Sequence, residues 1–382
     1  MAMANALEGL ATPAVIVDRD RLVRNIARIQ EKGERHGVHV RPHIKTHKCI
    51  EIARLQVAAG AIGITASKPA EALVFIEAGI ESVTVAYPIV DRRRAVTLLE
   101  AAAVHGCRLR TIADSDAVVS TLAAGAREVG TRLDVFLKID VGLGRVGVKP
   151  DSPDVIRLAG TIAEAGALRF AGLLAHAGHA YGARDPQAVR AIAESERLTL
   201  LGVAERLRAA GLEVPEISVG STPTVLAAEC FDGITEIRPG NYVFLDLTAV
   251  RQGLARLDDV ALSVLATVVS VNQSHAIIDA GSKVLSSDLG AHSTQGVIGY
   301  GRAFTLDQPL THEHCDAGLV VERLSEEHGF VALQGHRLSV GDRLRIVPNH
   351  SCPVVNLSHT LQVIDCQHPL ETWPVAARAL VQ

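Results

Sequence analysis

The hydrophobic pattern between about residues 38 and 244 alternates short apolar runs with longer segments in which apolar residues recur every three or four positions. Short apolar runs are typical of buried parallel strands, and the three- or four-residue spacing is typical of amphipathic helices. The runs that fit strands are 39–44, 62–67, 83–88, 108–114, 134–140, 170–178, 216–222 and 235–244. A strand followed by a helix, eight times in succession, predicts a (β/α)8 barrel within the α/β class.

After residue 245 the pattern changes to short alternating strands interrupted by Gly, Asp, His and Pro. This pattern predicts an all-β second domain. The apolar run 14–18 precedes the barrel series, so we expect it to pair with strands of the second domain. The expected division is a barrel domain over 19–245 and an all-β domain made of 1–18 and 246–382.

The composition narrows the class of protein and of partner. A chain of 382 residues that is 48% hydrophobic and 21% charged can bury a large core, which excludes disordered and fibrous proteins. The net charge of −4 and the scattered Lys and Arg favour a small-molecule partner over nucleic acid or an anionic membrane. Six irregularly spaced cysteines and an N-terminal segment without signal-peptide features lead us to expect a cytoplasmic location with no disulfide framework.

The segment RPHIKTHK places Lys45 at the carboxyl end of the first predicted strand, with His43 and His47 beside it. Catalytic groups of (β/α)8 barrels come from the carboxyl ends of the strands. Partial burial near imidazoles lowers the pKa of a lysine, so that part of its amine is neutral and able to act as a nucleophile. The alternative interpretation is a solvated loop lysine.

Two segments at the ends of the seventh and eighth predicted strands have the composition of a phosphate site. VGSTPTV contributes Gly220, Ser221 and Thr222 just before a helix-like stretch, and RPGNY contributes Gly240 and Asn241. Backbone N–H groups at a helix start bind phosphate, and barrels often bind phosphate after strands seven and eight. Taken singly, either segment is equally well interpreted as an ordinary turn.

The segment KIDVGLGRVGV matches the spacing G-x-G-x-x-G after a strand, but Pro150 and Pro153 interrupt the helix that a dinucleotide site needs. We therefore reject a nicotinamide site and interpret Arg145 as a residue that reaches inward from the rim or lies on the surface. Tyr181, in HAGHAY after the sixth strand, has the ring and hydroxyl that contact a flat cofactor. The histidines of that segment are interpreted as loop hydrogen-bonding groups.

In the predicted β domain, PNHSC places His350 and Cys352 two residues apart. On a strand, residues i and i+2 point to the same face, so an imidazole and a thiolate would share one metal ion, with zinc favoured. Two protein ligands leave positions for water or substrate, as in catalytic sites. The alternative is a polar turn with a buried thiol. A second cluster at 312–315, HEHC, is interpreted as a solvated loop.

The chain as a whole resembles the metal-activated, pyridoxal-phosphate-dependent D-serine dehydratase and D-threonine aldolase family, whose fold is similar to that of alanine racemase. The resemblance rests on motifs in this order: RPHIKTHK, KIDVGLGRVG, HAGHAY, VGSTPT, EIRPGNYVFLD, DAGSKVLSSD, LSEEHG and PNHSCPVVNL. It spans nearly the whole chain and includes both predicted domains.

The resemblance implies roles for the candidate residues. Lys45 would hold pyridoxal 5'-phosphate as a Schiff base and act as the base at Cα, while His350 and Cys352 would bind a divalent metal, zinc first and manganese or magnesium as alternatives. Arg145 and Tyr181 would lie near the cofactor ring. The phosphate would be held by Gly220, Ser221, Thr222, Gly240 and Asn241. A head-to-tail homodimer is also implied.

The implied activity is that of a lyase acting on D-serine, D-threonine or 3-hydroxy-D-aspartate, giving a 2-keto acid and ammonia by β-elimination. The H-x-C form of the metal segment resembles the dehydratases, whereas the aldolases tend to show H-x-D. The alternative is a D-threonine aldolase, which cleaves Cα–Cβ to glycine and an aldehyde. A racemase and a non-catalytic cofactor carrier fit less well, because neither needs His350 and Cys352.

Overall fold

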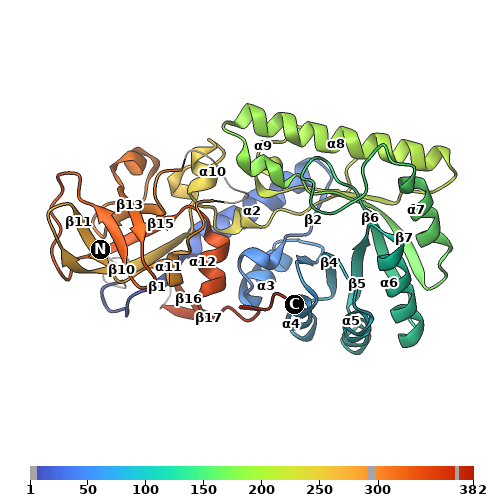
Figure 1. The fold of residues 1–382 in the computed structure, drawn as a ribbon, viewed down its shortest axis with the longest axis horizontal. Helices are drawn as coiled ribbons and strands as arrows, with labels where there is room; N and C mark the ends of the chain where they lie inside the picture. Colours follow the sequence, from blue (N-terminus) through green and yellow to red (C-terminus); the bar gives the residue numbers. More distant parts are fainter. Residues whose placement is uncertain (1–6, 291–296, 366–369) are drawn as a thin grey trace.

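The computed structural model describes residues 7–290, 297–365 and 370–382, and it contains two sheets at the centres of two lobes (Figure 1). The first is an eight-stranded parallel sheet in the order β2-β9-β8-β7-β6-β5-β4-β3. Its strands are β2 (His39–Val40), β3 (Ile64–Ala66), β4 (Ser82–Pro88), β5 (Arg108–Ala113), β6 (Leu133–Lys138), β7 (Leu168–Leu174), β8 (Glu216–Val219) and β9 (Glu236–Ile237). The predicted set of eight barrel strands is confirmed.

The sheet closes between β2 and β3. The backbone N–H of Ile62 donates to the Val40 carbonyl at 3.0 Å, and that of Thr65 donates to the Pro42 carbonyl at 2.8 Å. The connecting helices cover the outside of the barrel (Figure 1). They are α2 (Arg19–Arg35), α3 (Ile50–Ala58), α4 (Pro69–Glu77), α5 (Arg92–Val104), α6 (Asp116–Val129), α7 (Asp154–Glu164), α8 (Pro186–Ala209) and α9 (Thr222–Ala227).

Local sequence explains where these helices begin and end. Asp18 caps α2 by accepting the N–H of Arg21 at 3.0 Å, and Pro69 and Pro186 occupy the first turns of α4 and α8. Helix α6 ends at Gly130, whose φ of 73° lies in the left-handed region that glycine adopts without strain.

The second sheet has nine strands in the order β11-β14-β13-β12-β15-β10-β1-β16-β17. Strand β1 (Ala14–Asp18) is antiparallel to β10 and parallel to β16, so the expected pairing of this segment is confirmed. The proposed boundaries 19–245 and 246–382 stay a prediction. The other strands are β10 (Leu262–Val271), β11 (His275–Ile278), β12 (Gly301–Thr305), β13 (Leu319–Leu324), β14 (Gly329–Ala332), β15 (Arg343–Pro348), β16 (Thr360–Ile364) and β17 (Glu371–Pro374).

Short helices lie in the connections of both lobes. They are η1 (Ile44–Thr46), η2 (Gly178–Gly182), η3 (Asn241–Val243), α10 (Leu247–Arg251), η4 (Leu257–Asp259), α11 (Ser282–Leu285), η5 (His312–Ala317) and α12 (Ser351–Leu357). Cysteines in the described ranges are all free, and Cys366 lies outside them. None of the helices in the described part of the chain is both long and apolar enough to cross a membrane.

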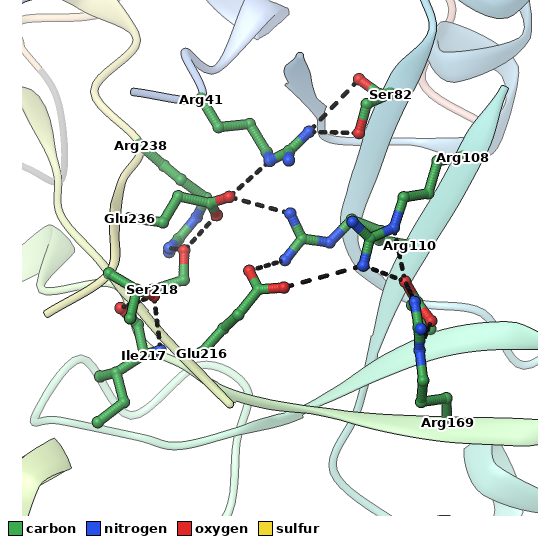
Figure 2. A network of polar contacts seen from close by, with 12 residues as sticks. Arg41, Ser82, Arg108, Arg110, Arg169, Glu216, Ile217, Ser218, Glu236 and Arg238 are labelled. Carbon is green, nitrogen blue, oxygen red and sulfur yellow. Dashed lines mark hydrogen bonds and ion pairs between the residues drawn. The ribbon is translucent and has the colours of Figure 1, made fainter. Parts of the chain in front are cut away.

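A network of buried ion pairs and hydrogen bonds lies near the amino ends of several barrel strands (Figure 2). Glu236 accepts hydrogen bonds from Arg41 at 2.6 Å, from Arg110 at 3.0 Å and from the Ser218 hydroxyl at 2.5 Å. Burial acts to raise the pKa of Glu236, but Arg41 and Arg110 outweigh it and lower the pKa to about 2. Arg238 donates to Ser218 in the same network, so these contacts fix a side chain that faces the other end of the barrel.

Candidate active site

A cavity of about 370 Å³ lies at the carboxyl ends of the barrel strands, where α12 of the second lobe packs against η1. Its size is in the range of small-molecule sites. The lining residues come from the loops after β2, β3, β6, β7, β8 and β9, from α12 and the residue before it, and from residue 381. They are His43, Lys45, Thr46, Lys48, Ser67, Lys68, Arg145, His176, Tyr181, Ser221, Thr222, Arg238, Gly240, Asn241, His350, Cys352, Pro353, Asn356 and Val381.

Lys45 lies in η1, directly after β2, and faces the cavity. Burial lowers the pKa of the Lys45 amine, against the opposing effect of the Cys352 sulfur. His43 also lines the cavity, and its Nδ1 accepts the Lys45 backbone N–H at 3.4 Å. His47, in contrast, is fully buried outside the cavity and accepts the Cys49 N–H at 3.2 Å. Of the two histidines beside Lys45 in the sequence, only His43 shares its cavity.

The loops after β7, β8 and β9 meet at the Thr222 side chain. Its hydroxyl accepts the backbone N–H groups of Gly240 and Tyr242, each at 3.2 Å, and it hydrogen-bonds to the Tyr181 hydroxyl. Burial raises the pKa of Tyr181, so this phenol stays protonated. Three residues that the sequence analysis took from separate segments are therefore in one cluster.

At Gly240 and at Gly220, neighbouring parts of the chain pack too closely to leave room for a side chain. A Cβ on Gly240 would lie 2.9 Å from the His43 carbonyl oxygen. Gly220 has a φ of +109°, and a Cβ there would lie 2.8 Å from a methyl of Val225. Gly220 lies behind the cavity wall, because its N–H is directed at Glu196 Oε1, 3.4 Å away.

Glu196, in the middle of α8, is a residue that the sequence analysis missed. Its Oε1 accepts the N–H of Ala177 at 3.0 Å as well as that of Gly220. It is 2% exposed and joins the loops after β7 and β8, which carry His176 and Ser221. Ser221 lines the cavity while capping α9, and its backbone N–H donates to Thr224 Oγ1 at 2.8 Å.

The Asn241 side chain belongs to a joint between the two lobes. Its amide donates to Asp246 Oδ2 at 2.7 Å and accepts from the Ser351 hydroxyl at 2.6 Å. The Ser351 backbone N–H donates to Asp246 Oδ2 at 3.0 Å. All three residues are buried, so the joint holds the start of α12 against the barrel.

The strand geometry expected for His350 and Cys352 is wrong. His350 is the residue that precedes α12, and Cys352 is in the first turn of that helix. A spacing of two is too short to distinguish a strand from the start of a helix. Both side chains nevertheless line the cavity, and Cys352 Sγ lies 3.3 Å from the hydroxyl of Thr46, the neighbour of Lys45. The second lobe thus brings both side chains beside the Lys45 turn.

His350 interacts with Asp288 and Cys352, and both groups affect the pKa of its imidazole. Burial acts to lower the pKa of His350, but the Cys352 thiolate and the Asp288 carboxylate raise it to about 10. Burial acts to raise the pKa of Cys352, and the charge of His350 outweighs it and lowers the pKa. Asp288 Oδ2 lies 2.8 Å from His350 Nδ1, which leaves Nε2 as the ring nitrogen for a metal. The sequence analysis gave Asp288 no role.

Other sequence predictions also have a place in the structure. The chain from 141 to 153 contains no helix before α7, as Pro150 and Pro153 indicated, and Arg145 is exposed on the cavity wall. The HEHC cluster lies in η5 and does not line this cavity. Among the described residues, no three His, Cys, Asp or Glu side chains are grouped as metal ligands.

Comparisons with known proteins agree with this architecture. A family model described as the N-terminal domain of alanine racemase matches residues 17–248, and one for a serine dehydratase domain matches residues 261–364. The chain belongs to the alanine racemase-like family of serine dehydratases. The resemblance seen in the motifs is thereby confirmed. Family members generally use pyridoxal 5'-phosphate and a divalent metal.

Full-length relatives include both dehydratases and aldolases, which makes this chain a lyase. It is 39% identical to D-threo-3-hydroxyaspartate dehydratase of Delftia sp. (strain HT23), over 97% of this chain and 98% of that one. It is 29% identical to a D-threonine aldolase of Arthrobacter sp, over 96% and 92% of the two chains. The solved Delftia enzyme superposes with a TM-score of 0.88 over 97% of this chain and 98% of that one, at 39% identity. Alanine racemase of Clostridium difficile 630, at 13% identity and a TM-score of 0.69 over 96% and 99% of the chains, shares the fold.

Proposed function

We propose that this lyase is a pyridoxal-phosphate- and metal-dependent dehydratase of D-β-hydroxy amino acids. The observation that carries the proposal is that Lys45 of the barrel and His350 and Cys352 of the second lobe line one cavity. A reaction at adjacent Cα and Cβ atoms needs a base for one and an acid for the other within reach of a single substrate. The 3.3 Å contact between Cys352 and Thr46 supports that arrangement.

The cavity residues fit pyridoxal phosphate. Lys45 has an amine whose pKa burial lowers, as a group that condenses with an aldehyde requires. Thr222 and Asn241 begin helical turns beside Gly240, where a side chain would clash with the His43 carbonyl. When bound, the cofactor supplies an electron sink for negative charge that develops at the substrate Cα.

The proposed holding residues are Lys45 for the aldehyde, with Arg145 and Tyr181 near the ring. Ser221, Thr222, Gly240 and Asn241 would hold the phosphate, the last through its backbone because its side chain is engaged in the joint. Gly220 would shape this loop from behind. Lys45 Nζ would be the base that takes the proton from Cα, and burial lowers its pKa towards the neutral form that a base needs.

His350 and Cys352 would hold the metal through Nε2 and Sγ, with Asp288 orienting the imidazole. Imidazole and thiolate favour zinc, with manganese or magnesium as alternatives. The Delftia relative has been solved as a cysteine-to-alanine variant in the metal-free form and as a histidine-to-alanine variant. The replaced positions are two apart in that chain, as they are here. A bound metal would act as a Lewis acid at the substrate β-hydroxyl.

The second candidate is a D-threonine-type aldolase, which the full-length similarity to such enzymes supports. Incubation with D-threonine distinguishes the two. Formation of 2-oxobutanoate and ammonia supports the dehydratase, whereas glycine and acetaldehyde support the aldolase. Absence of both sets of products, for D-serine and 3-hydroxy-D-aspartate as well, contradicts the proposed function. We also propose a cytoplasmic homodimer, which light scattering of the purified protein tests for its oligomeric state.

A further inference from the structure

Lys68 is a cation on the cavity wall that the proposed function does not use. It is the residue before α4, in the turn after β3, and it lines the cavity together with Ser67. Its Nζ lies 3.9 Å from the centroid of the Tyr87 ring, a cation–π contact that restrains the side chain. The backbone N–H and hydroxyl of Ser67 donate to Glu71 Oε2 at 2.5 and 2.8 Å, so the turn itself is fixed.

The other cations of the cavity have a partner or a proposed task. Lys48 pairs with Glu71 at 3.3 Å, and Arg238 is held by the ion network below. Lys45 and Arg145 serve the cofactor in the proposed function. Within the described part of the chain, no carboxylate lies within 4.0 Å of the Lys68 amine, and the lining contains no Asp or Glu. The positive charge of Lys68 is therefore available to an anionic ligand.

The wall that carries Lys68 is joined to the helix that carries the metal ligands. Asn356, on α12 like Cys352, accepts the Ala379 N–H at 3.2 Å and lines the cavity. The same chain segment reaches α4, where the Gln382 carbonyl accepts the Ala70 N–H at 3.1 Å. A substrate with its β-hydroxyl at His350 and Cys352 would have Cβ beside α12, so a further substituent on Cβ would lie in the same cavity as Lys68.

We propose that Lys68 binds a carboxylate carried on the substrate Cβ, and so selects dicarboxylic D-β-hydroxy amino acids over D-serine and D-threonine. This inference rests on the proposed function and adds the substrate class. Arg145, after β6, and Lys68, after β3, come from barrel strands that lie three places apart in the sheet. Lys68 therefore lies on a different wall from Arg145, and it can bind a second substrate carboxylate while Arg145 stays beside the cofactor ring.

Steady-state kinetics of Lys68→Gln test the assignment. Loss of a hydrogen bond to a charged group should lower kcat/KM for D-threo-3-hydroxyaspartate by ~10- to 100-fold, with little change for D-threonine. Lys68→Arg should recover part of the loss, because it keeps the charge. Lys149→Gln, at an exposed lysine outside the cavity, is the matched control. An equal loss on both substrates, or no loss on either, overturns the proposal.

A binding measurement separates failure of this inference from failure of the proposed function. Calorimetry with D-aspartate and D-alanine compares two ligands that lack the β-hydroxyl and differ in the second carboxylate. The wild-type holoenzyme should bind D-aspartate more tightly, and Lys68→Gln should weaken D-aspartate ~10-fold or more without affecting D-alanine. Equal affinities in the wild type, or an unchanged preference in the variant, contradict the role of Lys68. A wild type that binds D-aspartate preferentially but dehydrates no substrate contradicts only the proposed function.

Discussion

Two sets of charged side chains occupy opposite ends of the same barrel, and they differ in how their charges are balanced. At the amino ends of the strands, Arg41 and Arg110 share the buried Glu236, as Figure 2 shows. At the carboxyl ends, cations face a cavity whose described lining contains no Asp or Glu. Removing one partner of a balanced buried set leaves an uncompensated charge and destabilises the fold, whereas a cation on a cavity wall that has no carboxylate partner attracts an anion. We therefore interpret the Glu236 network as structural and the cavity cations without a carboxylate partner as ligand-binding.

The largest expected effect is at the cavity end. Lys45→Ala should lower turnover by roughly 10³-fold or more, because it removes both the cofactor attachment and the proposed base. The visible absorbance that the bound cofactor gives through Lys45 should disappear, while the melting temperature of the apoprotein stays close to that of the wild type. An unchanged spectrum would show that a different lysine holds the cofactor.

The opposite result is expected at the amino ends. Glu236→Gln leaves Arg41 and Arg110 facing a neutral partner and should reduce the free energy of unfolding by ~3–5 kcal/mol in urea titrations. Glu194→Gln is the control, since it breaks only the surface pair with Arg197 and should cost less than ~1 kcal/mol. Equal costs for the two variants would remove the distinction between the ends of the barrel.

The stability that the Glu236 network contributes should depend on pH. The pKa of Glu236 is about 2 in the folded protein, against 4.5 for an ordinary glutamate. A lowered folded pKa means that the unfolded chain binds the proton first, so stability from this group is complete above pH 4.5 and falls as the pH drops towards 2. The loss should amount to about 3 kcal/mol across that window. Urea titrations of wild type and Glu236→Gln between pH 5 and pH 3 should converge.

Metal removal tests the wall formed by the second lobe. Cys352→Ala should lose bound metal and ~100-fold or more of β-elimination activity, while the cofactor and the unfolding free energy are retained. Metal analysis together with product assays measures both. Cys230→Ala, at a half-buried thiol outside the cavity, is the control. Full activity in a metal-free Cys352→Ala protein would exclude the metal from the reaction.

The smallest effect is expected for Asp288, which contacts the proposed metal ligand His350. Asp288→Asn should weaken metal affinity by ~10- to 100-fold, because the amide no longer fixes the His350 ring as a carboxylate does. Titration with a competing chelator measures the change. If the Asp288→Asn variant bound metal as tightly as the wild type, the 2.8 Å contact between Asp288 Oδ2 and His350 Nδ1 would have only a structural role in the loop.

The sequence was informative where its signals are local. Periodic apolar runs predicted the barrel strands, and Lys45 was found because it follows one of them. Strands β12 and β17 are hard to predict from the sequence, since GRAFT and ETWP are short and lack clear alternation. Asp288 and Glu196 were missed because each reaches its partner only through the tertiary fold, as Asp288 does across 62 positions to His350.

Strand β1 is synthesised before the barrel, but both its neighbours in the sheet come after it. Ala14 lies opposite Leu265, and Ile16 lies beside Gln362. A growing chain therefore carries an apolar strand with two unpaired edges through synthesis of the whole barrel, and such edges promote association between chains. Docking of β1 is a late event in biogenesis, and shortening the chain before β16 would leave one of its edges permanently open.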